Sequence, residues 1–460
     1  MSVSSISKII TILILVNCIH LVKGGDDVAP KIKRPNILII IADDCTYNDL
    51  PLYGGKNAKT PYIDGLAEEG MLFNKAYLAE AMCQPCRSEL YTGQYPMRNG
   101  CAWNHSSSRP GTKSMVQYLE AQNYRVGLSG KVHVRPKDVY PFEKVEGFDV
   151  NCVRSPTRDH SLKGIKDFMV REEDKKFCLI VALVEPHVPW VMGDASKYPP
   201  KEIILPPNIA DTPITREAFS RYLAEITYMD NQVGDILKVL KETGKSEETL
   251  VIFTSEQGSQ FPGCKWTNWD TGLHTAFLAR WPGVIKGGSK TDALIQYTDV
   301  LPTLLEISGA PEIRKNFDGT SFYDVLLSRR KSHRQFTYGI HNNLPEGPSY
   351  PVRTISDGNF RYIRNLKSDE LYIEKHLMGW DGKGELKNPY WATWVRNSWA
   401  NKKTYQLVKR YMVRPHEELY HTSMDPYELN NLVSNSKYLE IKKRLGVRLD
   451  EWMGSQGDPG

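Results

Sequence analysis

The sequence lacks several features that mark specialised classes of protein. It has no internal repeat or low-complexity tract, and its lysine and arginine residues do not form the basic runs that are typical of nucleic-acid binders. The formal net charge is only +5 on 460 residues, of which 25% are charged and 40% are hydrophobic. This composition indicates an ordinary globular protein with a large core, and the mild positive charge suits an anionic substrate better than a nucleic acid.

Long apolar runs are missing outside the N-terminus. The run at residues 9–16 follows Lys8 and is too short to span a bilayer. We predict a signal peptide over residues 1–24, with cleavage before Gly25, and export to the periplasm or the medium. Leu15-Val16-Asn17-Cys18 offers an alternative, which is lipoprotein anchoring at Cys18. No other stretch is apolar enough to predict a membrane span.

Cysteine and glycosylation signals are sparse. Of the eight cysteines, Cys18 lies in the predicted signal peptide and Cys83 lies in a motif described below. The others allow many disulfide pairings, among which the sequence does not choose: Cys45, Cys86, Cys101, Cys152, Cys178 and Cys264. The single sequon Asn104-His105-Ser106 favours a bacterial exported protein over a lysosomal one.

Branched apolar runs alternate with helical patterns along most of the chain. Such runs are typical of the buried central strands of a parallel sheet. Strands are predicted at residues 37–42, 125–129, 177–184 and 250–254, and helices at 61–69, 115–120, 216–243 and 298–307. We therefore predict an α/β fold in which a large, mostly parallel sheet is sandwiched by helices.

The pattern changes in the last third of the chain. Strand patterns at residues 352–355 and 360–363 flank Ser356-Asp357-Gly358-Asn359, which is a hairpin signal. A helical pattern at about 438–453 closes the chain. A smaller C-terminal subdomain with an antiparallel sheet is therefore expected.

These patterns predict a catalytic domain over residues 34–330 and a C-terminal subdomain over residues 331–460. The subdomain contains a group of aromatic and basic side chains that suits either a sulfated sugar or ordinary packing. The group comprises Trp380, Trp391, Trp394, Trp399, Lys402, Lys403, Lys409 and Arg410.

Polar residues follow each predicted strand, at the edge where open α/β sheets bind their ligands. Asp43 and Asp44 follow the first strand, and two adjacent carboxylates repel each other unless a cation such as Ca²⁺ or Mg²⁺ lies between them. The alternative is that one of them caps a turn. The other strands are followed by Lys131 and His133, by His187, and by Glu256 and Gln257, with Lys265 and His274 further along.

The pair Lys131 and His133 offers two donors to an anion. The two residues are two positions apart, so on an extended segment both side chains would share one face. That geometry would hold a sulfate between an ammonium group and an imidazole.

The segment Cys83-Gln84-Pro85-Cys86-Arg87 contains a second anion-binding pattern. It places a thiol at the start of a predicted helix, where the backbone N–H groups and the helix dipole favour an anion and lower a thiol pKa. Arg87 adds a fixed cation, and Thr92-Gly93 ends the helix. The segment is therefore suited to a tetrahedral anion.

The spacing Cys-x-Pro-x-Arg followed by Thr-Gly resembles the motif of the type I, formylglycine-dependent sulfatases of the alkaline phosphatase superfamily. The resemblance runs from about Arg34 to Leu432. It implies that a maturating enzyme oxidises Cys83 to formylglycine (3-oxoalanine), whose hydrate is the nucleophile. It also implies that one Ca²⁺ is held by Asp43, Asp44, modified Cys83, Glu256 and Gln257.

The same resemblance implies a role for each remaining candidate. Arg87 would stabilise the hydrate, and Lys131, Lys265 and His187 would hold the sulfate oxygens. His187 would protonate the leaving group, and His133 would take a proton from the hydrate. The chain departs from the family at Glu256-Gln257, where most relatives carry Asp followed by Asn or His.

Further motifs resemble the heparan N-sulfatase (sulfamidase) branch, which is similar to bacterial enzymes that desulfate algal polysaccharides such as ulvan. They include Gly130-Lys131-Val132-His133-Val134 and the segment 425–432. We therefore expect a sulfated poly- or oligosaccharide substrate, with ulvan favoured and a sulfamidase substrate as the alternative.

Three other functions stay open. A phosphodiesterase or phosphonate hydrolase of the same superfamily would use the same formylglycine. A non-catalytic sulfoglycan-binding protein would result if Cys83 is never converted. A thioredoxin-like dithiol at Cys83 and Cys86 would need neither Arg87 nor Thr92-Gly93.

Overall fold

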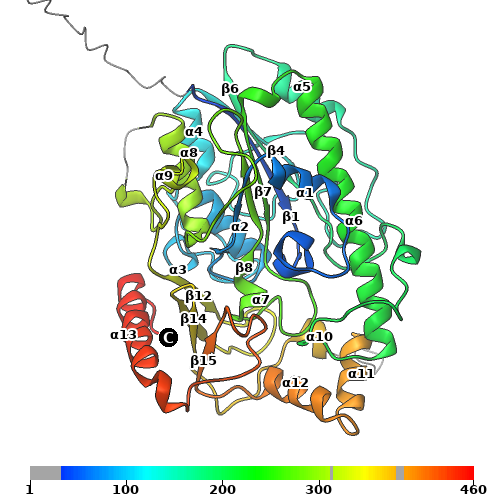
Figure 1. Cartoon of the computed structure of the whole chain (residues 1–460). Helices are drawn as coiled ribbons and strands as arrows, with labels where there is room; N and C mark the ends of the chain where they lie inside the picture. Colours follow the sequence, from blue (N-terminus) through cyan, green and yellow to red (C-terminus); the bar gives the residue numbers. More distant parts are fainter. Residues whose placement is uncertain (1–32, 311–313, 380–387) are drawn as a thin grey trace, which may run out of the picture. The chain divides into compact units, whose positions relative to one another are not determined.

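The structure is a computed structural model that describes residues 33–310, 314–379 and 388–460. The predicted signal peptide, Cys18 and Trp380 lie outside these ranges. Residues 34–460 form one compact unit, in which the described strands make a large sheet, a four-stranded sheet and a small three-stranded sheet (Figure 1). Within the described ranges, no helix combines the length and the apolar character needed to cross a membrane.

The large sheet has the strand order β10-β2-β9-β7-β1-β6-β4-β5. Its five strands from β7 to β5 run parallel, whereas β9 is antiparallel to both of its neighbours. The strands are β1 (Asn36–Ala42), β2 (Met71–Phe73), β4 (Tyr124–Gly130), β5 (Glu143–Lys144), β6 (Lys176–Ala182), β7 (Thr249–Ser255), β9 (Phe277–Arg280) and β10 (Ser289–Thr291). The predicted α/β fold is confirmed, with a large sheet that is mixed at one side.

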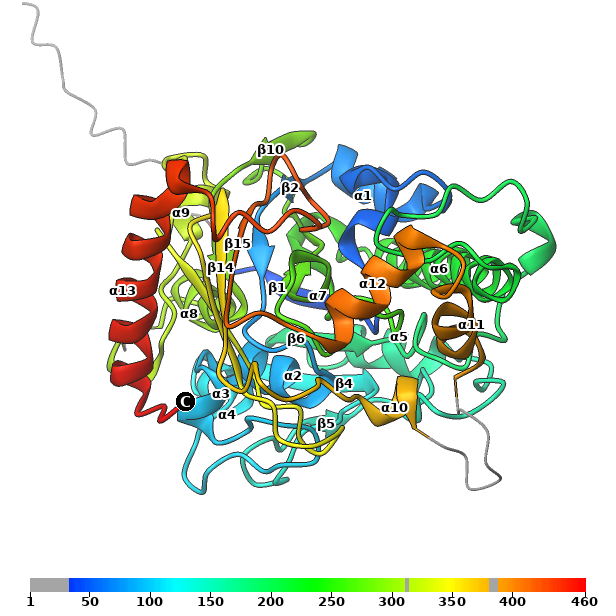
Figure 2. The ribbon, with the colours of Figure 1, turned by 90° about the horizontal axis from the view of Figure 1, so that it is seen from below.

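Helices cover both faces of the large sheet (Figures 1 and 2). On one side lie α1 (Pro61–Glu68), α5 (Lys163–Val170) and α6 (Pro213–Glu242). On the other lie α2 (Cys83–Thr92), α4 (Met115–Glu120) and α8 (Val300–Ile307). Because helices cover both faces, the central strands are buried along their whole length, as their continuous apolar runs predict.

The long helix α6 begins three residues before the predicted start. Thr212 is its N-cap, and the Thr212 hydroxyl accepts a hydrogen bond from the Thr215 backbone N–H. Pro213 then occupies the first turn, where its missing N–H is not needed. The sequence did not reveal this start, because the apolar residues that recur at steps of three and four begin only at Phe219, after the first turn.

The remaining described elements are short or belong to the C-terminal part. The helices are α3 (Pro96–Asn99), α7 (Asp270–Leu273), α9 (Tyr323–Leu326), α10 (Lys375–Met378), α11 (Pro389–Asn397), α12 (Lys402–Met412) and α13 (Leu439–Gln456). The three-stranded sheet consists of β3 (Ala76–Tyr77), β8 (His274–Thr275) and β11 (Ile295–Gln296).

The four-stranded sheet is antiparallel and consists of β12 (Thr337–His341), β13 (Val352–Ser356), β14 (Phe360–Asn365) and β15 (Glu417–His421). The hairpin β13–β14 and the closing helix α13 confirm the predicted C-terminal pattern. Arg361 on β14 forms ion pairs with Asp270 of α7 at 2.7 Å and with Glu428 at 2.9 Å. This buried network connects the four-stranded sheet to the region that follows β7. The domain boundary at residue 330 stays a prediction.

The segment after β4 is not extended, which corrects the geometry expected for Lys131 and His133. Gly130 has a φ of +92°, and a Cβ atom there would lie 2.0 Å from the Ala182 carbonyl oxygen. His133 also has a positive φ, at 42°. Gly130 and His133 therefore depart from the extended conformation.

The described tryptophans of the predicted aromatic and basic group differ in their exposure to solvent. Trp391 and Trp394 of α11 are buried, and the Trp394 indole donates a hydrogen bond to the Thr215 hydroxyl of α6. Trp399 is 88% exposed. Packing therefore explains the two buried tryptophans. The cysteines of the described residues are all unpaired thiols.

Candidate active site

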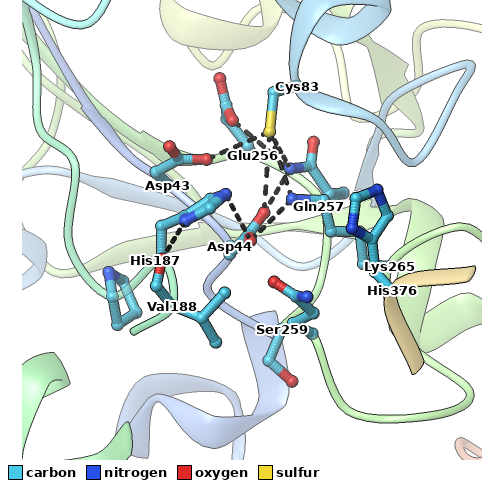
Figure 3. Close-up of polar contacts among 12 residues, drawn as sticks. Asp43, Asp44, Cys83, His187, Val188, Glu256, Gln257, Ser259, Lys265 and His376 are labelled. Carbon is cyan, nitrogen blue, oxygen red and sulfur yellow. Dashed lines mark hydrogen bonds and ion pairs between the residues drawn. The ribbon is translucent and has the colours of Figure 1, made fainter. Parts of the chain in front are cut away.

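Cys83 occupies the first position of α2, as the sequence predicts. The helix ends at Gly93, whose φ of 66° allows a left-handed cap that non-glycine residues rarely adopt. The Cys83 side chain is buried, and its Sγ lies 3.1 Å from Gln257 Nε2 and 3.4 Å from Lys265 Nζ (Figure 3). The thiol therefore faces polar groups that come from distant parts of the chain.

The acidic side chains meet because two parallel strands end at the same level. Ala42 of β1 pairs with Ser255 of β7, so Asp43 and Glu256 leave neighbouring strand ends together. Cys83 Sγ lies 3.5 Å from Asp43 Oδ1 and 3.8 Å from Asp44 Oδ1. The Gln257 amide donates a hydrogen bond to Asp44 Oδ1 at 2.6 Å. The four residues expected to hold a metal thus surround Cys83.

Each carboxylate of this cluster has a cationic partner. Lys131 pairs with Asp43, Lys265 pairs with Asp44 at 2.7 Å, and Arg87 pairs with Glu256. All of these side chains are at most 3% exposed. Buried charges of this kind are tolerated only when they are paired, so the positions of the acids and the bases depend on each other.

Burial and charge act in opposite directions on the carboxyl groups. Burial disfavours the ionised Asp43 carboxylate, but Lys131 and His187 outweigh it and hold the Asp43 pKa well below its usual range. Burial raises the pKa of Glu256, and Asp43 opposes its ionisation, although Arg87 acts in the other direction. The cations therefore favour the ionised form of Asp43, whereas burial and the nearby Asp43 charge oppose ionisation of Glu256.

The thiol responds to the same cations. Burial and Asp43 oppose ionisation of Cys83, whereas Lys131 and Lys265 favour it, and the net effect is a lowered pKa. Cys86, one turn along α2, has a pKa raised well above its usual value by burial and by Glu256. The two thiols therefore differ in reactivity, and only Cys83 is suited to chemistry.

Two histidines of the site have opposite pKa shifts. His187 Nε2 lies 3.4 Å from Asp44 Oδ2, and although burial lowers the His187 pKa, Asp44 raises it well above the usual value. His133 has its pKa lowered to about 2 by burial, by Lys131 and by Arg87. At neutral pH His187 therefore carries a proton, whereas His133 is a neutral imidazole whose protonation burial, Lys131 and Arg87 oppose.

A cavity of about 470 Å³ opens onto this cluster. Five of the predicted site residues line it: Cys83, Lys131, His133, His187 and Lys265. Arg87, Asp43, Asp44, Glu256 and Gln257 lie behind them in the buried layer. His274 does not belong to this wall, because it pairs with Asp270 at 3.0 Å and stacks on Tyr47.

Several lining residues were missed by the sequence analysis. They are Asn104, His105, Val150, Asn151, Cys152, Val153, Val188, Gln260, Trp266, Glu346 and His376. Most lie on irregular segments, where no periodic pattern places a side chain. Asn104 belongs to the sequon, which suggests an exposed glycosylation site and not a cavity residue. Its side chain is instead buried, and its amide nitrogen donates a hydrogen bond to Glu346.

The buried acids offer a donor set that fits a hard divalent cation. Donor atoms of Asp43, Cys83 and Glu256 lie within 4.8 Å of one another, as do those of Asp44, Cys83 and His187. Carboxylate oxygens are the ligands that Ca²⁺ prefers. The Gln257 amide would have to turn to present its oxygen, and amide orientation is assigned from hydrogen bonding.

Comparison with known proteins identifies the family. Residues 35–310 match the sulfatase family. The chain belongs to this family of sulfuric ester hydrolases. Residues 265–379 also match the C-terminal region of N-sulphoglucosamine sulphohydrolase.

Individual relatives of this sulfatase cover most of the chain. An ulvan-active sulfatase of Formosa agariphila is 33% identical over 93% of this chain and 81% of its own length. Human N-sulphoglucosamine sulphohydrolase is 26% identical over 93% of this chain and 91% of its own length. A protein solved with its substrate D-glucosamine-2-N,6-O-disulfate has the same fold, with a TM-score of 0.71 and 18% identity over 93% of this chain and 99% of that one.

The buried pairing of Arg87 predicts a large stability effect. We expect Arg87→Met to lower the free energy of unfolding by about 3 kcal/mol or more, because it leaves Glu256 buried without its cation. Urea denaturation measures this loss. The matched control is Arg98→Met, whose pair with Asp318 is partly exposed and whose loss we expect to cost about 1 kcal/mol at most. Equal losses in the two variants would contradict the proposed charge balance.

Proposed function

We propose that this sulfatase removes sulfate groups from a sulfated polysaccharide or its oligosaccharides, and that an algal polysaccharide such as ulvan is the favoured substrate. The observation that carries the proposal is a buried thiol, Cys83, that faces two lysines and two histidines at the end of a cavity of about 470 Å³. The ulvan-active relative supports the choice of polysaccharide. We also propose export to the periplasm or the medium, where such polymers are available.

A second candidate substrate is an N-sulfated glucosamine residue. It is favoured by the match of residues 265–379 to the C-terminal region of N-sulphoglucosamine sulphohydrolase. The solved relative with a bound disulfated glucosamine has the same fold, which makes the architecture compatible with such a ligand.

The proposed chemistry needs one metal ion and one modified residue. Ca²⁺, held by Asp43, Asp44, Glu256 and Gln257, would polarise a sulfate oxygen and lower the pKa of the attacking hydroxyl. Conversion of Cys83 to formylglycine by a maturating enzyme would supply that hydroxyl. The low exposure of Cys83 in the folded protein favours conversion before folding is complete.

The remaining residues bind the sulfate group and move protons. The Lys131 and Lys265 ammonium groups, both in the cavity wall, would hold sulfate oxygens, and positioned cations in a partly dry pocket stabilise the transition state. His187 would protonate the leaving oxygen or nitrogen, because its pKa is raised. His133 would take a proton from the hydrate, the role that the family resemblance implies, against the effect of burial, Lys131 and Arg87, which hold its pKa at about 2.

The role of His187 predicts a dependence on the leaving group. We expect His187→Asn to lower kcat for a sulfated saccharide by about 10²-fold or more, since a sugar alkoxide leaves poorly without a proton. The loss for 4-nitrophenyl sulfate should be less than about 10-fold, since the phenolate is a stable leaving group. Steady-state kinetics on both substrates measures the difference. Equal losses would show that His187 does not act as the acid.

The proposed function is tested by sulfate release from ulvan and heparan oligosaccharides, with peptide mass spectrometry across Cys83. We expect the peptide to carry an aldehyde in place of the thiol, and Cys83→Ala to lower kcat by more than about 10³-fold. Cys86→Ala is the matched control and should retain activity. Faster turnover of an aryl phosphodiester than of any sulfate would favour a phosphodiesterase. An unconverted Cys83 together with tight saccharide binding would favour a binding protein.

A further inference from the structure

Three side chains from separate segments form one wall of the cavity and have no part in the proposed sulfate chemistry. Glu346 lies between β12 and β13, His376 lies in α10, and Asn104 lies between α3 and α4. Figure 3 draws His376 together with Lys265, and the His376 ring stacks on Trp266, which follows Lys265 in the chain. The three wall residues therefore line the same cavity as the side chains that are proposed to bind the sulfate.

Glu346 is held in one orientation by its two neighbours. The Asn104 amide nitrogen donates a hydrogen bond to Glu346 Oε1 at 2.9 Å, and His376 Nε2 bonds to Glu346 Oε2. Asn104 Oδ1 in turn accepts a hydrogen bond from the Gln84 backbone N–H at 3.2 Å. Because both Glu346 oxygens are anchored, the carboxylate is pre-organised and loses little freedom when a ligand binds.

The wall is joined to the proposed sulfate-binding end by an aromatic residue. The His376 ring stacks on the Trp266 ring, with centroids 5.4 Å apart and an interplanar angle of 9°. Lys265 Nζ lies 5.1 Å from the centroid of the same Trp266 ring. If Lys265 holds the sulfate group of a substrate, the sugar ring that bears this sulfate therefore lies close to Glu346 and His376.

The charge of this wall limits what it can bind. Glu346 is buried, and although burial opposes its ionisation, His376 and Asn104 lower its pKa to about 2. The pair of Glu346 and His376 is therefore neutral or negative, whichever form His376 takes. Lys265, which pairs with Asp44 at 2.7 Å, is already assigned to the sulfate in the proposed function. The wall offers no free cation to a second anionic group, whereas each carboxylate oxygen keeps a spare lone pair for a donor.

We propose that Glu346, positioned by Asn104 and His376, is a specificity-determining residue that accepts a hydrogen bond from a hydroxyl or N–H group of the sugar ring carrying the sulfate. This inference rests on the proposed sulfatase function. It follows that the sugar ring of the substrate is uncharged on the side that faces Glu346 and carries a hydroxyl or N–H group there. A second sulfate or a carboxylate on that side is disfavoured.

The test compares a saccharide with a substrate that has no sugar donors. We expect Glu346→Gln to lower kcat/KM for a monosulfated saccharide by about 10-fold or more relative to its effect on 4-nitrophenyl sulfate, because removing a buried charged acceptor weakens the hydrogen bond. The variant should also turn over a disulfated saccharide better, relative to the monosulfated one, than the wild type does. A purely structural role of Glu346 would not produce this change in preference.

Glu217→Gln is the matched control, because Glu217 is exposed on α6. We expect it to leave both ratios within about twofold of the wild type, and a thermal melt checks that both variants fold. Equal loss by Glu346→Gln on saccharide and aryl sulfate, or no loss on either, would overturn the inference.

A binding measurement separates this inference from the proposed function. Calorimetry of a sulfated monosaccharide with Cys83→Ala and with Cys83→Ala/Glu346→Gln needs no turnover. At least about 10-fold weaker binding to the double variant supports the role of Glu346 even if the wild type releases no sulfate, a result that would overturn the proposed function alone. Equal affinities would overturn the inference about Glu346.

Discussion

The structure depends on the compensation of buried charge around Cys83. Three carboxylates, from Asp43, Asp44 and Glu256, lie almost without solvent beside two lysines and an arginine. Removing any one partner would leave a charge in a medium that solvates it poorly. The same balance lowers the pKa of Cys83, raises that of His187 and lowers that of His133. One electrostatic arrangement therefore sets the protonation of Cys83, His187 and His133 together.

The sheet is what makes this arrangement achievable. Strands β7, β1, β6 and β4 are adjacent and parallel, so the residues that follow them emerge at one edge. These residues include Glu256 after β7 and Asp43 after β1. The buried strands fix the backbone positions, and the loops that follow carry the candidate site residues. Residues that are more than 200 positions apart in the chain thus contact one another without long flexible connections.

The sequence predicted the parts of the site that local rules determine. Continuous apolar runs located the central strands, and the polar residues directly after them were therefore expected at one edge. The start of α2 at Cys83 and its end at Gly93 followed from helix-terminus chemistry. The family motif added the expectation of a metal and a modified cysteine, which stay proposals.

The parts that the sequence did not predict depend on tertiary contacts. Gly130 has a positive φ and lies close to the Ala182 carbonyl, and His133 also has a positive φ, so Lys131 and His133 are not on a regular extended segment. Glu346 comes from an irregular segment and His376 from the short helix α10, both in the C-terminal part, and only packing brings them to the cavity. The role of Asn104 was also hidden, because its sequon suggests a surface position whereas its amide is engaged with Glu346.

The most direct test is an anomalous difference map from a crystal of the protein grown with Ca²⁺. We expect a single peak at about 2.3–2.6 Å from oxygens of Asp43, Asp44 and Glu256, with the Gln257 amide turned to present its oxygen and the Lys131 and Lys265 ammonium groups displaced toward the cavity. A map without a peak, in which Lys131 still contacts Asp43 and Lys265 still contacts Asp44, would contradict the interpretation of this acidic cluster as a cation site.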